Sequence, residues 1–357
     1  MARVTIEQVA RRAKVSRATA ARILNSDVQY HRPACAKRAE EIRRLARRMG
    51  YRPNAAAKAI STGRFRHVGL VMGTHYERSN FTREMIRGIH DALQERGMHL
   101  SLWFLDDAQL NNESQLPIFL REQMVDGLLI NYTHAIPPHM TKAISRSGFP
   151  VVWVNVKKPT RCVYPDDIEA GRRAVEYCVG LGHCRIAFAD LVHGPENDFL
   201  PHYSVEDREA GYVTGMVAAG LTPHFIRVPR MLNGAAAVAR AMDALRADAR
   251  PTAVVCQSPR DLSVFEVAAA RLGLPIPAGL SLMTFGSERQ TASALEPTLL
   301  VEPREEMGRA AVVALLEQID APNRRCPARH IPYTLREGET TAVAPVLPQK
   351  ETHEPGA

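Results

Sequence analysis

From residue 67 to about residue 285, short apolar runs alternate with longer amphipathic segments, and this alternation constrains the fold more than any other feature of the 357-residue chain. The runs predict strands at residues 67–72, 100–105, 127–130, 150–156, 185–190, 225–228, 253–257 and 281–285. The amphipathic segments predict helices at residues 81–94, 114–123, 140–147, 168–181, 207–219, 235–247 and 262–272. Such alternation is typical of an α/β body with parallel sheets and helices on both faces.

Positive charge is concentrated in front of this body. Residues 1–66 hold 17 Lys and Arg against 4 Asp and Glu, whereas the rest of the chain holds 29 against 34. The head therefore has a formal charge of +13 and the body a formal charge of −5. A basic head on a mildly acidic body indicates that the head binds a polyanion, although a merely solvated basic surface would give the same count.

The basic head has the pattern of a helix-turn-helix. Thr5 precedes a helical repeat of apolar residues and can cap that helix. After a short break, Ser16 can cap a second helix at residues 17–24. Two short helices this close together predict the motif, in which the start of the second helix enters the major groove of DNA. The alternative is a capped helical hairpin with surface arginines.

The motif assigns DNA contacts to individual residues. Arg17, Ala18 and Arg22 are expected to face base edges, and an arginine there can bond guanine in bidentate fashion. Phosphate contacts are expected from Thr5, Ser16, Thr19 and Asn25.

A third helix and a short conditional helix complete the head. The third is expected at residues 33–49, with Pro33 in its first turn and Gly50 at its end. Its apolar stripe consists of Cys35, Ala39, Ile42, Leu45, Ala46 and Met49. Asn54 can cap an alanine-rich segment that follows. A helix this short is marginal in water, so it should form only when another contact holds it.

The segments VTIEQVARRAKVSRATAARILN (residues 4–25) and GYRPNAAAKAI (residues 50–60) resemble the head and hinge of the LacI/GalR (lac-repressor) family of transcriptional regulators. The resemblance implies that a hinge helix enters the minor groove and wedges a base step with an apolar side chain. Ile60 stands at the position of that wedge, and Lys58 at a hinge position that is usually basic. Lys14 replaces a usual glycine and Ala21 a usual serine, and the segment 26–32 is longer than usual.

The body extends the resemblance through VDGLLI (125–130), GFPVV (148–152), PTAVV (251–255) and MGRAA (307–311). These segments imply a periplasmic-binding-protein-like body in which the chain crosses between two lobes near residues 160, 292 and 328. The resulting division is a head at 1–51, a hinge at 52–66, an N-lobe at 67–160 and 293–328, a C-lobe at 161–292 and 329–345, and a tail at 346–357. A small effector would bind between the lobes, at the carboxyl ends of the strands.

The resemblance also implies a set of effector-binding residues: Phe81, Asn155, Asp166, Ser204, Arg208, Ser258 and Ser287. Arg208 would act as a rigid donor fork for hydroxyls or a carboxylate. Gly286 replaces an aspartate that often accepts bonds from sugar hydroxyls or purine N–H groups. Asp166, Ser287 or Glu288 would have to take its place, or the ligand would differ.

Other classes of protein are disfavoured. There is no run of about 18 apolar residues and no secretory signal, and the six cysteines are irregularly spaced, which together fit a reduced cytoplasmic compartment. No phosphate loop, nucleophile elbow or zinc-protease motif is present, and His134 and His139 lack a metal-ligand set. We therefore expect no enzyme activity, no cofactor and no metal site.

The sequence thus predicts a sequence-specific DNA-binding regulator, expected to be a repressor, whose affinity for a near-palindromic operator is set by a small effector such as a sugar or sugar derivative. The tail lacks leucine heptads, so a homodimer is expected rather than a tetramer. One alternative is an architectural protein that binds DNA without regard to sequence and has a non-functional effector pocket. Another is a solute-binding protein of the transport type with an incidental basic head.

Overall fold

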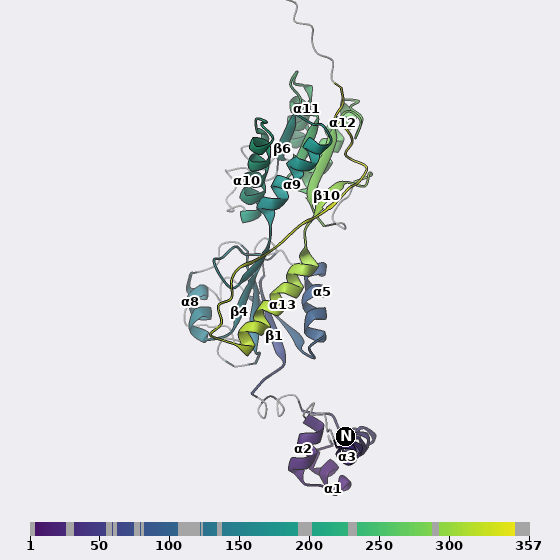
Figure 1. Ribbon diagram of the computed structural model, residues 1–357, viewed down its shortest axis with the longest axis vertical. Helices are drawn as coiled ribbons and strands as arrows, with labels where there is room; N and C mark the ends of the chain where they lie inside the picture. Colours follow the sequence, from purple (N-terminus) through teal and green to yellow (C-terminus); the bar gives the residue numbers. More distant parts are fainter. Residues whose placement is uncertain are drawn as a thin grey trace, which may run out of the picture.

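The structure, a computed structural model, describes residues 4–25, 32–54, 63–74, 82–105, 124–133, 138–191, 202–227, 234–287 and 293–346, together with residues 59, 79 and 122. These residues form a helical head and two α/β lobes that follow one another along the long axis of the molecule (Figure 1). Lys58, Ile60, Phe81, His134, most of the tail and all but one residue of the predicted helix at 114–123 lie outside the described residues.

Three helices build the head: α1 (Ile6–Ala13), α2 (Arg17–Asn25) and α3 (Pro33–Arg48). Their common core contains Ala13, Ile23, Ala39 and Ile42, as the apolar spacing predicted. Gly50 has a positive φ of 72°, which lets the chain leave α3 in the left-handed conformation. Cys35 was wrongly assigned to the stripe: it is exposed, because the buried face of α3 begins one turn later, at Ala39.

The first lobe is a six-stranded parallel sheet in the order β11-β5-β4-β3-β1-β2. Its strands are β1 (His67–Gly73), β2 (His99–Leu105), β3 (Gly127–Asn131), β4 (Val151–Val154), β5 (Cys162–Pro165) and β11 (Arg329–Ile331). The helices α5 (Arg83–Gln94) and α13 (Arg304–Asp320) pack on one face, and α8 (Pro138–Ser147) packs on the other (Figure 1). The inner strands β1, β3 and β4 are buried on both faces, which explains their continuous apolar sequences, whereas the edge strand β2 is partly exposed.

The second lobe repeats this plan in the order β12-β10-β9-β8-β6-β7. Its strands are β6 (Ile186–Asp190), β7 (His224–Arg227), β8 (Ala253–Cys256), β9 (Ser281–Gly286), β10 (Thr298–Val301) and β12 (Thr334–Arg336). The helices α9 (Asp167–Gly180) and α10 (Tyr203–Ala218) cover one face, and α11 (Gly234–Arg246) and α12 (Pro259–Arg271) cover the other. The predicted class of fold is confirmed, with one exception to parallel pairing, since β12 runs antiparallel to β10.

The chain passes between the lobes three times. It crosses at residue 166, between β5 and α9, at residues 302–303, between β10 and α13, and at residues 332–333, between β11 and β12. Each crossing comes later than the sequence suggested. The reason is that β5, β10 and β11 were not predicted as strands, so each crossing was expected before the strand that precedes it.

Helix α13 belongs to the first lobe although it follows the second lobe in the sequence. It lies beside α5 (Figure 1), and two glycines permit the close approach. A Cβ atom on Gly88 would overlap the carbonyl of Glu305, and one on Gly308 would press against the carbonyl of Met85. Glycine is therefore required at these two positions because a Cβ atom would not fit between the helices, and not because of the backbone conformation.

Helix α10 begins at Tyr203, four residues before the predicted start. His202 caps it, because the Nδ1 atom of His202 accepts a bond from the Ser204 amide at 3.4 Å. This places Ser204 in the first turn of the helix and Arg208 one turn further along. None of the helices in the described part of the chain is both long enough and apolar enough to cross a membrane.

Candidate functional site

The predicted caps of the helix-turn-helix are present. Thr5 and Gln8 form a reciprocal capping box on α1, in which each side chain accepts the backbone amide of the other residue, at 3.3 and 2.8 Å. The Oγ atom of Ser16 accepts the Thr19 amide at 3.1 Å and lies 2.9 Å from the Thr19 hydroxyl. These hydroxyls fix the two helices, and their contacts with phosphate stay a prediction.

The turn between α1 and α2 keeps the geometry that glycine usually provides. Lys14 adopts the left-handed conformation, with φ 54° and ψ 45°, and its amide closes the end of α1 on the carbonyls of Ala10 and Arg11. The lysine at this position therefore leaves the turn unchanged but places a residue with a Cβ atom in a conformation that disfavours one.

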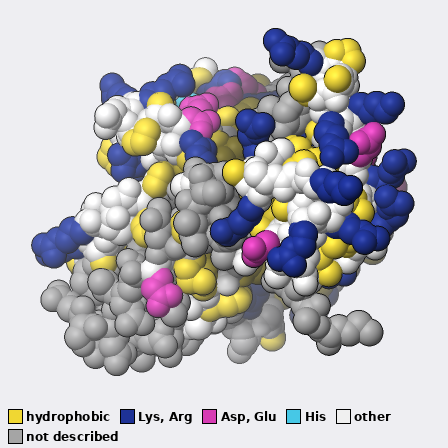
Figure 2. Space-filling model, turned by 90° about the horizontal axis from the view of Figure 1, so that it is seen from below, with side chains coloured by type: hydrophobic (Ala, Val, Ile, Leu, Met, Phe, Trp, Pro, Cys, Tyr) yellow, Lys and Arg dark blue, Asp and Glu magenta, His cyan; other side chains and the backbone are white. Residues whose placement is uncertain are grey.

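Helix α2 presents one buried and one open face. Ala20 and Ile23 are buried against the other helices, whereas Arg17, Ala18 and Arg22 are exposed. Asn54 is exposed as well, whereas Thr19 and Asn25 are half-buried. Figure 2, which views the molecule from the head end, shows Lys and Arg side chains spread over the surface of the head. The open face of α2 thus lies in a basic surface suited to a polyanion.

In the second lobe, Arg208 is the centre of a buried polar cluster. Its Nε atom donates to Asp167 Oδ1 at 2.7 Å, its Nη1 atom to the carbonyl of Gln257 at 3.1 Å, and its Nη2 atom to the Tyr333 hydroxyl at 2.9 Å. The guanidinium carbon lies 4.8 Å from the centre of the Phe285 ring. Arg208 thereby joins α9, α10, the end of β8 and the crossing at residues 332–333.

Asp167 is the acidic member of the cluster. Burial raises the pKa of its carboxyl to about 6, even though Arg208 and the Tyr333 hydroxyl favour the charged form. The Tyr333 hydroxyl donates to Oδ1 at 2.7 Å, and Oδ2 is enclosed with no hydrogen-bond partner among the described residues. A buried acceptor of this kind favours a hydrogen-bond donor from a ligand.

Contacts between the lobes surround Asn155, which follows β4 in the first lobe. Asn155 is buried with φ 58°, and its Oδ1 atom accepts the Tyr203 hydroxyl at 3.0 Å. Its carbonyl accepts His202 Nε2 at 3.2 Å. Two residues later, Lys157 Nζ pairs with Asp207 of α10 at 2.7 Å. These contacts hold α10 against the end of the first-lobe sheet.

The other residues expected at the effector site lie in two groups. The Ser204 hydroxyl is 2.8 Å from His202 Nδ1, so it lies beside Asn155 in the interlobe contacts. Ser287 is buried just after β9. Asp166 instead caps α9 and pairs with His330 at 2.8 Å, and Ser258 caps α12 while donating to Asp261 at 2.6 Å. The polar atoms of Asp166 and Ser258 are thus engaged within the protein.

The structure explains the glycine at position 286. A Cβ atom there would lie 3.0 Å from Cγ of Pro259, the first residue of α12. Any larger side chain, including the aspartate of the family pattern, would press on that proline. An aspartate at position 286 would require the ring of Pro259 to give way by a few tenths of an ångström.

Several residues of this region escaped the sequence interpretation. Asp167, Tyr333 and the pair Lys157 and Asp207 were not predicted. Only Asp167 had a signal, because it adjoins Asp166 at the start of an expected helix. As for metals, the described residues bring together no group of three or more His, Cys, Asp or Glu side chains that could hold an ion.

The chain is similar to known regulators of transcription. Residues 175–341 match the periplasmic binding protein-like domain family. The HTH-type transcriptional repressor CytR of Escherichia coli K12 is 28% identical over 328 residues, which are 88% of this chain and 89% of CytR. The lac repressor dimer bound to operator and the anti-inducer ONPF superimposes with a TM-score of 0.72 at 20% identity, over 96% of this chain and all of the other. A CelR–cellobiose complex superimposes with a TM-score of 0.59 at 23% identity, over 95% and 100% of the two chains.

Proposed function

We propose that the chain is a regulator of the LacI/GalR family and that it represses transcription by binding a near-palindromic operator as a homodimer, with an affinity set by a small effector bound between its lobes. Two heads in a symmetric dimer match two half-sites of such an operator. A repressor of this kind acts on chromosomal DNA, and we place it in the cytoplasm.

The observation that carries this proposal is the open face of α2. Arg17 and Arg22 are exposed there, on a helix whose start is capped by Ser16 and whose other face is packed on the head. A supported helix with exposed arginines on its outer face can enter the major groove and bond guanine O6 and N7. Thr5, Ser16, Thr19, Asn25 and Asn54 would contact the backbone on either side.

The hinge would couple this head to the lobes. Lys58 would contact phosphate, and Ile60 would wedge a base step in the minor groove. Residues 1–51 would act as the head, 52–66 as the hinge and 67–345 as the sensing and dimerisation body. Effector binding would change the angle between the lobes and so the distance between the two hinges of the dimer.

For the effector we propose a sugar or sugar derivative. One of the similar solved structures is a complex of the regulator CelR with cellobiose. In this chain, Arg208, Asn155 and Ser204 lie at or near the contacts between the lobes, and Arg208 has more N–H groups than its three protein acceptors use. Ser287 would contribute a hydroxyl near Gly286, and Phe81 would cover the ligand.

Selection of bound sequences from a random DNA pool by the full-length protein, at about physiological salt, tests the proposal. We expect a near-palindromic site with two half-sites. Arg17→Ala should relax base preference within each half-site, by about 1–3 kcal/mol at the contacted base. The control is Arg48→Ala, which removes an exposed arginine from α3 and should leave the preferred sequence unchanged. DNA binding without any enriched sequence would contradict the proposal.

A second comparison tests the hinge. Ile60→Gly should weaken binding to the selected operator more than binding to random DNA, because the wedge acts only on a site that can kink. Equal losses on both kinds of DNA would exclude the wedge and leave the head contacts as the source of specificity.

A further inference from the structure

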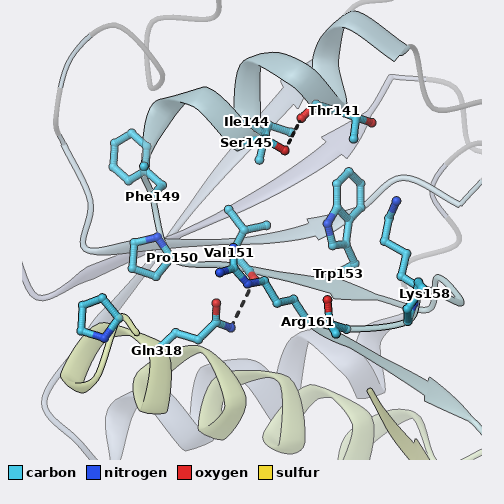
Figure 3. A pocket seen from close by; sticks show the side chains of 14 residues that line it. Thr141, Ile144, Ser145, Phe149, Pro150, Val151, Trp153, Lys158, Arg161 and Gln318 are labelled. Atoms are coloured by element: carbon cyan, nitrogen blue, oxygen red, sulfur yellow. Dashed lines mark hydrogen bonds between the residues drawn. The ribbon is translucent and has the colours of Figure 1, made fainter. Parts of the chain in front are cut away.

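A cavity of about 630 Å³ lies in the first lobe. None of the residues that line it belongs to the Arg208 cluster of the second lobe. It is bordered by α8, the beginning of β4, the C-terminal end of α13 and the segment 158–161 (Figure 3). All of these elements belong to the first lobe. Its volume falls within the range of about 300–1,000 Å³ that is usual for small-molecule sites.

The inner wall of the cavity is apolar and aromatic. Ile144 of α8 and Phe149, Val151 and Trp153 around β4 contribute to it. Gln318 closes the floor from α13, where its Nε2 atom donates to the Val151 carbonyl at 3.2 Å. Figure 3 shows the Trp153 ring pointing toward α8, with the Lys158 side chain beside it. The flat ring offers a surface on which an apolar or aromatic body can lie.

The charged residues of the lining are all basic. Lys158 and Arg161 are its only charged members, and the lining contains neither Asp nor Glu. The Nζ atom of Lys158 lies 4.4 Å from the centre of the Trp153 ring. Among the residues that the structure describes, no carboxylate forms an ion pair with Lys158 or Arg161, although their neighbour Lys157 pairs with Asp207. Two cations in the lining of a cavity, with no carboxylate beside them, favour an anion.

We propose that this cavity binds a small organic anion with an apolar or aromatic body. The anionic group lies between Lys158 and Arg161, and the body packs on Trp153 and Phe149. The side chains of Thr141, Ser145 and Thr160 supply further polar contacts around the mouth. This site is separate from the effector site between the lobes, and it does not depend on which effector or operator the protein recognises.

The cavity lies next to residues that form contacts between the two lobes. Asn155 and Lys157 contact α10 of the second lobe, and Lys158, in the same segment, faces the cavity. An anion that attracts Lys158 therefore acts one residue away from an ion pair that joins the lobes.

The experiment uses the full-length protein with Trp103→Phe, which leaves Trp153 as the only tryptophan of the two in the chain. Three probes share one body and differ in charge: 4-tert-butylbenzoate, the neutral 4-tert-butylbenzyl alcohol and the cationic 4-tert-butylbenzylamine. We expect the benzoate to change the Trp153 fluorescence saturably and to bind about tenfold more tightly than the alcohol, and the amine to bind most weakly. Calorimetry on the unmodified chain provides a second measurement.

Substitutions then place the binding in the cavity. Lys158→Gln and Arg161→Gln should each weaken benzoate binding about three- to tenfold, and Ser145→Phe should abolish it by filling the space. The matched control is Lys142→Gln, on the exposed side of α8 outside the lining, which should leave binding unchanged. The proposal is overturned if no probe binds, if the three probes bind alike, or if the benzoate binds equally well to the Lys158→Gln and Arg161→Gln variants.

Discussion

Arg208 and Asp167 form an ion pair with a distance of 2.7 Å between Nε and Oδ1, and the carboxylate is fully enclosed. The pair connects the second turn of α10 to the first turn of α9 and, through Tyr333, to the last crossing between the lobes. Desolvation offsets most of the attraction within such a pair, so its main effect is to fix the relative positions of these three elements.

Asp167→Asn should remove a pH dependence of stability. The pKa of Asp167 is raised by burial from 3.8 to about 6, so between these values the folded protein holds a proton that the unfolded chain has released. This group therefore makes the protein less stable as the pH rises through that window, by on the order of 3 kcal/mol. Urea unfolding of both proteins at about pH 4 and pH 6.5 measures the difference.

The matched control is the neighbouring Asp166→Asn, whose carboxylate lies at the surface of the same helix start and pairs with His330. It should keep the difference that the unmodified chain shows between the two pH values. If Asp167→Asn also kept that difference, Asp167 would not be the group that titrates.

The ion pair between Lys157 and Asp207 should favour the closed arrangement of the lobes. Lys157→Asp places two carboxylates opposite each other, so the lobes should separate more often, and the radius of gyration from small-angle scattering should increase. Since the pair is partly exposed, its loss is worth up to about 1 kcal/mol, or about fivefold in the ratio of closed to open protein. The double variant Lys157→Asp, Asp207→Lys should restore the original radius, and failure to do so would exclude an electrostatic contribution.

Lys14→Gly should stabilise the head by about 0.5–1 kcal/mol. The backbone of Lys14 is left-handed, which glycine adopts without the penalty that a Cβ atom causes. Hydrogen exchange of the α1 and α2 amides in the full chain measures the effect. Lys14→Ala removes the same charge but keeps the Cβ atom, so it should not slow the exchange. Equal protection in the two variants would mean that charge, and not backbone strain, is responsible.

Gly88→Ala should destabilise the first lobe by about 2 kcal/mol or more, because α5 and α13 would have to move apart to accommodate the methyl group. Thermal unfolding with calorimetric detection measures this loss. Gly180→Ala, at the end of α9 where a Cβ atom would meet no neighbouring atom within 4 Å, is the matched control and should be neutral or slightly stabilising. If the two variants unfolded alike, the close crossing of α5 and α13 would not be required.

Much of the architecture was accessible from the sequence because strands buried on both faces have continuous apolar sequences. The runs at β1, β6, β8 and β9 predicted their strands to within one residue or so at each end. The strands β5, β10, β11 and β12 were not predicted, although β8 is just as short as β5 and β10. The three-residue strands β11 and β12 contain charged side chains and no apolar run, so their sequences carry no strand signal, and their places in the sheets depend on partners far away in the chain.

Some polar residues between the lobes were also predictable from the sequence, and others were not. Arg208 was accessible through the resemblance to a known family, but its partner Tyr333 lies 125 residues away and has no local signal. Asp166 was chosen over Asp167 because adjacent carboxylates at a helix start are alike in sequence. Only the direction of each side chain separates the one that caps the helix from the one that enters the core.

The place of α13 in the fold has a consequence for synthesis on the ribosome. Met307, Ala311 and Leu315 complete the core that contains Leu70 and Ile89, so the first lobe lacks one covering helix until residue 320 has emerged. The core of α1, α2 and α3 lies within residues 9–46 and can form early. At a translation rate of about 5–20 residues per second, roughly ten to thirty seconds pass between the synthesis of β5 and the completion of α13. During that interval one apolar face of the first-lobe sheet lacks its covering helix, and the second lobe is made as far as β10 before the first can finish folding.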